Sequence, residues 1–279
     1  MIFRSGAHVR GVATAVAAVG VVALAVAVAP AAGAAPAEGA ASIHPGVVTE
    51  SDGGGACTSN FVFTSGDRTF IGQAAHCAGT GTATETDGCD SSSGPLGTAV
   101  TILADDGTER IGTLAYSSWL AMQEAGETDE NACSFNDFAL VEIADSDVAD
   151  VDPTIPFFGG PNGLDTDGLP AGEEVHSYGN SPLRQGLAAL SPKSGVSAGD
   201  HGAGWTHEVY TVTPGVPGDS GSAFVDADGD AIGTLSTLNL APLPLSNGVS
   251  DLAKTLEYAR AHSEFTDLEL TLGKAPFKG

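Results

Sequence analysis

Short apolar runs, separated by Gly, Asp, Asn and Ser, follow one another along the chain from about residue 42 onwards. Most of them contain β-branched or aromatic residues and are short enough to be single strands between tight turns. The pattern therefore predicts an all-β sandwich or barrel. The runs that we expect to form strands are Asn60–Phe63, Thr69–Ala74, Ala99–Leu103, Ile111–Tyr116, Phe138–Ile143, Glu174–Tyr178, Glu208–Thr213, Ser222–Val225 and Ala231–Thr237.

A helical period appears only close to the C-terminus. Leu252, Leu256 and Ala259 recur at steps of four and three residues, which places them on one face of a helix. Ser250 is a suitable N-cap, and the negative charge of Asp251 favours a helix N-terminus. We therefore expect one helix, at roughly residues 250–262.

Residues 1–34 have the pattern of a secretory signal peptide. Arg4 and Arg10 precede a run of apolar and small residues at 11–29. Ala32-Gly33-Ala34 then fits the small-residue cleavage motif. An uncleaved membrane anchor is the alternative, because a run of this length nearly spans a bilayer. The later sequence holds no comparable run, so we expect a protein secreted to the extracellular space without stable membrane association.

The remaining sequence is expected to consist of a short N-terminal segment, 35–49, and one domain, 50–279. Hydrophobic residues make up 42% of the sequence, which is enough for a core and argues against a largely disordered chain. Lys and Arg number 10 against 35 Asp and Glu, which gives a net charge of −25. Such an acidic surface repels phosphate backbones and anionic lipids, so we expect no nucleic-acid partner.

The cysteines form an even set in a chain that is expected to be exported. Two disulfides are the default in an oxidising compartment, and the sequence leaves all three pairings open. Zinc binding is disfavoured, because no Cys-x-x-Cys pair is present and only His76 is adjacent to a cysteine. We therefore expect disulfides and no metal site at the four cysteines, which are Cys57, Cys77, Cys89 and Cys133.

Three short motifs carry the candidate chemistry. His76 lies in Gln-Ala-Ala-His-Cys, Asp137 opens a predicted strand in Asn-Asp-Phe-Ala-Leu-Val, and Ser220 lies in the turn Gly-Asp-Ser-Gly. Each motif alone also fits a structural histidine, a turn aspartate or an ordinary glycine turn. Their combination, in the order His, Asp, Ser, is far more specific.

These three residue types fit nucleophilic catalysis. A serine hydroxyl is a poor nucleophile at neutral pH and needs a base within hydrogen-bond reach. His76 can be that base, because histidine titrates near the working pH. A buried Asp137 would hold the imidazole in the correct tautomer and stabilise the imidazolium that forms during attack.

In this order the motifs resemble those of the trypsin/chymotrypsin-like serine peptidases, and the chain resembles their secreted bacterial members over roughly 50–262. The resemblance implies two antiparallel six-stranded β-barrels, with the active site in the cleft between them, and a C-terminal helix. It also implies a serine endopeptidase that acts as a monomer on protein or peptide substrates and needs no cofactor. The catalytic residues would be His76, Asp137 and Ser220, with the N–H groups of Gly218 and Ser220 as the oxyanion hole.

Further residues are assigned by the same resemblance. Ser236 would contact the buried aspartate, and its backbone would pair with bound peptide. Pro214 and Leu238 would border the pocket for the side chain before the scissile bond. An acidic residue there would predict cleavage after Lys or Arg, and neither residue is acidic. The disulfides that the resemblance implies are Cys57–Cys77 and Cys89–Cys133.

The sequence departs from the animal members of this family at the N-terminus. It has no Ile-Val-Gly-Gly start whose new α-amino group could pair with the acid before the serine, Asp219. A buried carboxylate needs a partner, and Arg184 is our candidate. A solvated surface arginine is the alternative at that position.

Other interpretations of the same residues stay open. If Pro214 and Pro217 hold the 214–221 loop in a collapsed form, the protein would bind peptides without cutting them. An esterase would use the same three residues on a different substrate. His201 and His207 are expected to be exposed loop histidines rather than metal ligands.

Overall fold

The structure, a computed structural model, describes residues 41–82, 86–239 and 245–279. The expected signal peptide, 1–34, lies outside the described residues. These described residues belong to one compact unit. Within the described part of the chain, no helix has the length and apolar character needed to cross a membrane.

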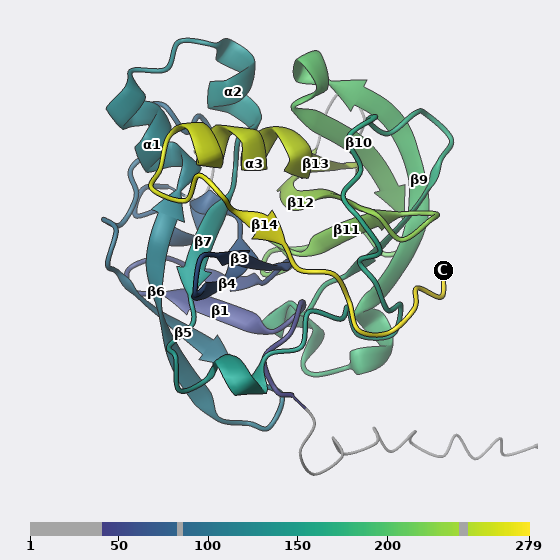
Figure 1. The fold of residues 1–279 in the computed structure, drawn as a ribbon. Helices are drawn as coiled ribbons and strands as arrows, with labels where there is room; N and C mark the ends of the chain where they lie inside the picture. The colour runs from purple at the N-terminus through teal and green to yellow at the C-terminus, as the bar shows by residue number, and fades with distance from the viewer. Residues whose placement is uncertain (1–40, 83–85, 240–244) are drawn as a thin grey trace, which may run out of the picture. The chain divides into compact units, whose positions relative to one another are not determined.

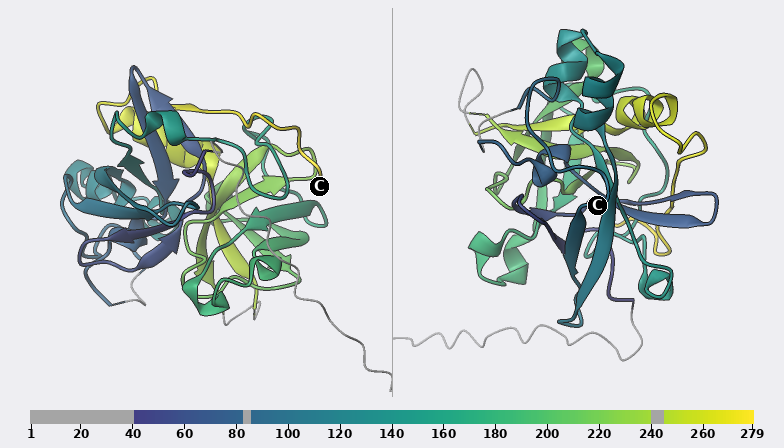
Figure 2. Two further views of the ribbon diagram at one scale, coloured as in Figure 1. Left: turned by 90° about the horizontal axis from the view of Figure 1, so that it is seen from below. Right: turned by 90° about the vertical axis from the view of Figure 1, so that its left-hand side faces the viewer.

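Two antiparallel β-sheets make up the fold, the first mainly from the N-terminal half of the chain and the second from the C-terminal half. The first contains β1 (Val48–Ser51), β2 (Ala56–Thr58), β3 (Val62–Ser65), β4 (Arg68–Gln73), β5 (Ala99–Leu103), β6 (Glu109–Ser117), β7 (Ala139–Glu142) and β14 (Glu269–Leu270). The second contains β8 (Glu174–Tyr178), β9 (Pro192–His201), β10 (Thr206–Thr211), β11 (Ala223–Asp226), β12 (Ala231–Leu238) and β13 (Asn247–Asp251). Figures 1 and 2 show the two sheets side by side.

The second sheet closes into a six-stranded barrel in the order β10-β13-β12-β11-β8-β9. The first sheet has the order β14-β3-β4-β7-β6-β5-β1-β2 and contains eight strands rather than the six expected. The two additional strands are short: β2 pairs with β1, and β14 from the C-terminal tail pairs with β3. The expected all-β class, with a six-stranded barrel and a C-terminal helix, is confirmed.

The C-terminal helix, α3 (Leu252–Ala261), begins two residues later than expected. The side chain of Asp251 caps it by accepting a hydrogen bond from the N–H of Lys254. Ser250 still belongs to β13, and its hydroxyl donates to the carbonyl oxygen of Phe135 in the other half of the chain. Because this tertiary contact uses the Ser250 hydroxyl, the next residue becomes the cap.

Two short helices, α1 (Ser118–Ala125) and α2 (Glu130–Phe135), were not expected. Helices of this length make too few turns to leave a clear period in the sequence. Trp119 and Met122 of α1 are buried in the core, and α1 contacts α3 (Figure 1). The short 3-10 helices are η1 (Ala75–Ala78), η2 (Val148–Asp150), η3 (Pro182–Arg184), η4 (Ala188–Leu190) and η5 (Gly202–Gly204).

Phenylalanines fill the core of the first sheet. Phe63, Phe70 and Phe138 have no exposed surface, and the rings of Phe63 and Phe138 meet edge to face at 5.4 Å between centroids. Such aromatic contacts add to the stabilisation that comes from burying apolar area. Ile43 and Val47 are also fully buried, so the chain joins this core before the domain boundary expected at residue 50.

His207 is buried, contrary to the expectation of an exposed loop histidine. It lies in β10, with Nδ1 at 2.7 Å from Asp200 Oδ1 and Nε2 at 3.1 Å from Asp251 Oδ2. Burial disfavours the imidazolium, but the two carboxylates outweigh burial and raise the pKa of His207. The side chain thus joins β9, β10 and the N-terminus of α3, which is a structural role.

Candidate active site

Two adjacent strands bring His76 and Asp137 together. Antiparallel pairing of β4 with β7 sets Gln73 opposite Ala139, so residues just after β4 and just before β7 lie at the same end of the sheet. His76 follows in η1, and Asp137 precedes β7. The backbone N–H of His76 donates to Asp137 Oδ1 at 2.9 Å, and His76 Nδ1 lies 2.6 Å from Asp137 Oδ2.

The Asp137 carboxylate is buried and receives a further bond from the second barrel. Ser236 Oγ in β12 donates to Asp137 Oδ2 at 2.6 Å, the contact that the resemblance implied. Burial favours the neutral acid, but the imidazole and these hydrogen bonds outweigh it and lower the pKa of Asp137. Burial likewise opposes protonation of His76, yet the charge of Asp137 raises the pKa of His76 above its ordinary value.

Ser220 lies on a turn between β10 and β11, at the contact between the two halves of the chain. Thr58 N–H of β2 donates to the Ser220 carbonyl oxygen at 2.8 Å, and Gly221 N–H donates to the Leu235 carbonyl oxygen at 2.7 Å. Gly221 has φ of +87°, and a Cβ there would lie 2.5 Å from the Thr58 carbonyl oxygen. Only glycine fits this turn, because any other residue would be strained and would collide with the first sheet.

The two carbonyl groups on either side of Gly218 are both held by hydroxyl groups. Ser181 Oγ donates to the Pro217 carbonyl oxygen at 2.6 Å, and Thr58 Oγ1 donates to the Gly218 carbonyl oxygen at 2.7 Å. Gly218 itself has φ of +94°, in the left-handed region that favours glycine. The orientation of both peptide groups is therefore fixed by side chains that no sequence motif singled out.

Asp219 is fully buried and has two cationic partners. Arg184 Nη2 contacts its Oδ2, as predicted from the sequence, and Lys193 Nζ lies 3.0 Å from the same oxygen. The backbone N–H groups of Val216 and Ser181 also donate to the carboxylate, at 3.0 and 3.1 Å. Burial opposes ionisation, but Arg184 and Lys193 outweigh it and hold the pKa of Asp219 below its ordinary value. Burial in turn lowers the pKa of Lys193, although Asp219 opposes that shift.

Sequence reasoning missed Lys193, although its side chain is more deeply buried than that of Arg184. It lies in β9, a strand rich in Gly and Ser that the hydrophobic pattern did not predict. Its side chain has no exposed surface. The signal that could have found it is the scarcity of basic residues. With 10 Lys and Arg against 35 Asp and Glu, each lysine is a candidate partner for a buried carboxylate.

Both disulfides connect the cysteines as the resemblance implied, Cys57 with Cys77 and Cys89 with Cys133. The first ties η1, which carries His76, to β2. Among the described residues, the two clusters of His, Cys and Asp side chains close enough to share a metal ion each contain one of these disulfides. Their sulfur atoms are therefore already bonded.

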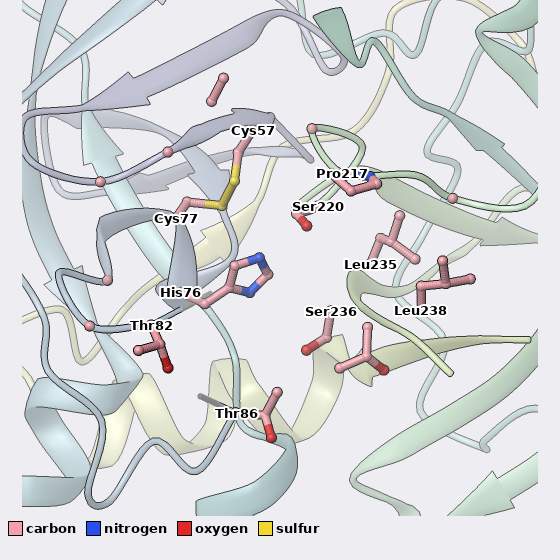
Figure 3. Close-up of a pocket in the computed structure, with 18 of the residues that line it drawn as sticks. Cys57, His76, Cys77, Thr82, Thr86, Pro217, Ser220, Leu235, Ser236 and Leu238 are labelled. Atoms are coloured by element: carbon pink, nitrogen blue, oxygen red, sulfur yellow. A yellow bond between two sulfur atoms is a disulfide. The ribbon is translucent and has the colours of Figure 1, made fainter. Parts of the chain in front are cut away.

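A cavity of about 690 Å³ lies against these residues, shown in Figure 3. His76, Gly218, Ser220, Ser236 and Leu238 line it, and the close-up shows the His76 ring and Ser220 facing one another. The buried Asp137 lies behind the histidine ring and is not part of the lining. Pro214 does not line the cavity either, and Gly215 takes the place expected for it.

No protein-family model matches this sequence, and no curated protein sequence matches it. Among solved structures, the chain is similar to Thermobifida fusca protease A, with a TM-score of 0.51 and 16% identity over 83% of this chain and 99% of that chain. It is also similar to a Glu endopeptidase, with a TM-score of 0.50 and 15% identity over 78% of this chain and 91% of that chain. At these identities the likeness establishes the fold, which is that of the chymotrypsin-like serine proteases.

Replacing Lys193 by Met tests the buried ion cluster. We expect a loss of about 3 kcal/mol in the free energy of unfolding at pH 7, because Asp219 keeps its charge but loses one of two cationic partners. The low pKa of Asp219 stabilises the fold above the unfolded value of about 3.9, and this contribution disappears as the pH falls through the folded-state pKa. Urea unfolding should therefore show a smaller difference between the two proteins at pH 3 than at pH 7.

The exposed Lys278 provides the matched control, and Lys278→Met should change the stability by less than about 0.5 kcal/mol at either pH. A Lys193→Met protein as stable as the wild type at pH 7 would contradict the assigned role. So would a loss of the same size at both pH values.

Proposed function

We propose that this protein is a secreted serine endopeptidase in which His76, Asp137 and Ser220 form the catalytic triad. The observation that carries the proposal is the pairing of His76 Nδ1 with the buried Asp137, on the wall of a cavity that also carries Ser220. The chymotrypsin-like fold supports it, because the same fold places a nucleophile and base from two barrels at one cleft. The signal-peptide pattern at 1–34 and the two disulfides support export to an oxidising compartment.

The proposed reaction begins with attack of Ser220 Oγ on the carbonyl carbon of a peptide bond. With Nδ1 engaged by Asp137, His76 accepts the serine proton at Nε2, and the carboxylate stabilises the imidazolium. The imidazolium then donates this proton to the leaving amine, and an acyl-enzyme remains on Ser220. His76 next takes a proton from water, which attacks the ester carbon. The imidazolium then returns this proton to Ser220 Oγ as the ester C–O bond breaks and the acid product leaves.

The oxyanion of each tetrahedral intermediate would bind to the N–H groups of Gly218 and Ser220. In a trans peptide group the C=O and N–H point in opposite directions. The Pro217 carbonyl points to Ser181, so the N–H of Gly218 in the same peptide group points away from Ser181. Gly218 also lines the cavity, and both observations support its N–H as a donor to the developing negative charge.

An active-site probe tests the proposal directly. A fluorophosphonate should add once to the secreted protein, and intact mass should show no adduct on Ser220→Ala, because only an activated serine reacts at a useful rate. The mass of the unlabelled protein should place its N-terminus near Ala34 or Ala37. A folded wild-type protein that takes up no probe would contradict the proposal and favour a peptidase-like binding protein.

The pH dependence of kcat/KM tests the roles of His76 and Asp137. Activity needs the neutral imidazole, so kcat/KM should rise with pH and level off above an apparent pKa that exceeds about 6.5, since Asp137 raises the pKa of His76. In Asp137→Asn we expect a lower apparent pKa and a loss in kcat of about 10⁴-fold. If the apparent pKa were the same in both proteins, the charge of Asp137 would not be the cause of the raised pKa of His76.

Substituting Ser181 tests the orientation of the oxyanion hole. Ser181→Ala removes the bond to the Pro217 carbonyl, so kcat should fall by about 10- to 100-fold while KM stays nearly constant. Ser181→Thr keeps the hydroxyl and should restore most of the activity. A Ser181→Ala protein whose loss lies in KM, or whose loss Thr does not repair, would show that Ser181 does not position the peptide.

A further inference from the structure

The cavity continues from Ser220 into a space between two backbone segments. One segment is Gly215–Gly218 and the other is Leu235–Leu238, and both line the cavity. Figure 3 shows Pro217, Leu235 and Leu238 on the far side of Ser220 from His76. A substrate with its carbonyl carbon at Ser220 and its oxygen at the Gly218 N–H would direct the preceding side chain, called P1, into this space.

The side chain of Asn247, which also lines the cavity, links the two segments. Asn247 begins β13 and pairs with Leu238 in β12. The N–H of Gly215 donates to Asn247 Oδ1 at 2.8 Å, and Asn247 Nδ2 donates to the Thr237 carbonyl oxygen at 3.1 Å. The carboxamide thus bridges both walls and forms a floor between them.

This floor is tightly packed. Asn247 is 1% exposed, and a Cβ added to Gly215 would lie 2.9 Å from Asn247 Nδ2 and 2.7 Å from Leu235 Cδ2. Both ends of the carboxamide are bonded to backbone atoms inside the protein, and breaking these bonds would leave buried polar groups without partners. Displacing Asn247 would therefore cost free energy, and a long P1 side chain does not fit in the space that remains.

The floor is also uncharged. Among the described residues that line the cavity, His76 is the one ionisable side chain, and it lies on the opposite side of Ser220. A buried Lys, Arg, Asp or Glu side chain would find no counter-charge at the carboxamide, and burial of an unpaired charge is unfavourable. The pocket thus opposes charged residues as well as long ones.

We propose that Asn247 is the residue that sets the specificity of this pocket, and that it selects peptides with a small uncharged side chain, such as Ala, Val or Thr, at P1. The proposal rests on the proposed peptidase function. The carboxamide limits the room between the two segments, and Leu238, which also lines the cavity, favours apolar contact. The acidic surface attracts basic peptides, but the pocket itself offers a basic side chain no partner.

The test is a set of fluorogenic tetrapeptide amides that share P4 to P2 and differ only at P1, with Ala, Val, Phe, Lys or Glu there. We expect kcat/KM for Ala and Val to exceed the values for Phe, Lys and Glu by at least about tenfold, the effect that one or two misplaced methylenes have in a closed pocket. In Asn247→Gly the floor is removed, so the ratio of kcat/KM for Phe to that for Ala should rise at least about tenfold.

Two further variants complete the experiment. Asn247→Asp keeps the shape, exchanges the donor to the Thr237 carbonyl for an acceptor and adds a negative charge, so it should raise kcat/KM for Lys relative to Ala by at least about tenfold. Asn162→Gly makes the same change as Asn247→Gly at an exposed position outside the cavity and should leave the profile unchanged. If Asn247→Gly does not fold, the wild-type profile and Asn247→Asp still decide the question.

Labelling of Ser220 by the fluorophosphonate, measured on the same preparations, separates the two proposals. No labelling of the folded wild type overturns the proposed function. Labelling together with a preference for Phe, Lys or Glu overturns the role of Asn247 alone. So does labelling together with P1 ratios that Asn247→Gly and Asn247→Asp leave unchanged.

Discussion

The arrangement of the candidate site depends on one buried charge, the carboxylate of Asp219. It has no exposed surface, so its ionised form persists only because Arg184 and Lys193 lie against it and two backbone N–H groups donate to it. A buried ion pair adds little net stability compared with apolar packing, but losing one partner is costly. The cluster therefore ties the 216–221 turn to β9 and η3, and that turn carries both Gly218 and Ser220.

The contact between the two sheets is the second constraint. Thr58 in β2 donates through its N–H to Ser220 and through its hydroxyl to Gly218, and Gly221 fits against the same strand only because it has no side chain. On the other side, Ser236 in β12 donates to Asp137. Each half of the chain thus holds the proposed catalytic groups of the other half. Backbone and hydroxyl contacts of this kind fix geometry more than they add stability, because each replaces a hydrogen bond to water.

Most strands followed from the alternation and clustering of apolar residues, and the differences have local causes. The strands β9 and β13 contain many Gly, Ser, Asp and Asn residues and therefore lack an apolar pattern, although closure of the barrel pairs them on both sides. The helix α3 was predicted, but its first residue was not, because both Ser250 and Asp251 are good caps. A lone histidine in a sequence gives no sign of burial, so the sequence predicts an exposed His207. In the structure, Asp200 and Asp251 balance its charge inside the protein.

The sequence by itself determined the strand-rich class, the C-terminal helix and the three motifs around His76, Asp137 and Ser220, because these depend on short-range periodicity and on which side chains can do the chemistry. Tertiary structure alone decided which residues support them. Lys193, Ser181 and Asn247 lie in segments without a motif, and they matter only because folding brings them against the 215–219 turn. A sequence records which groups are present. Their distances are set by barrel closure and by the packing of the two sheets, which join residues far apart along the chain.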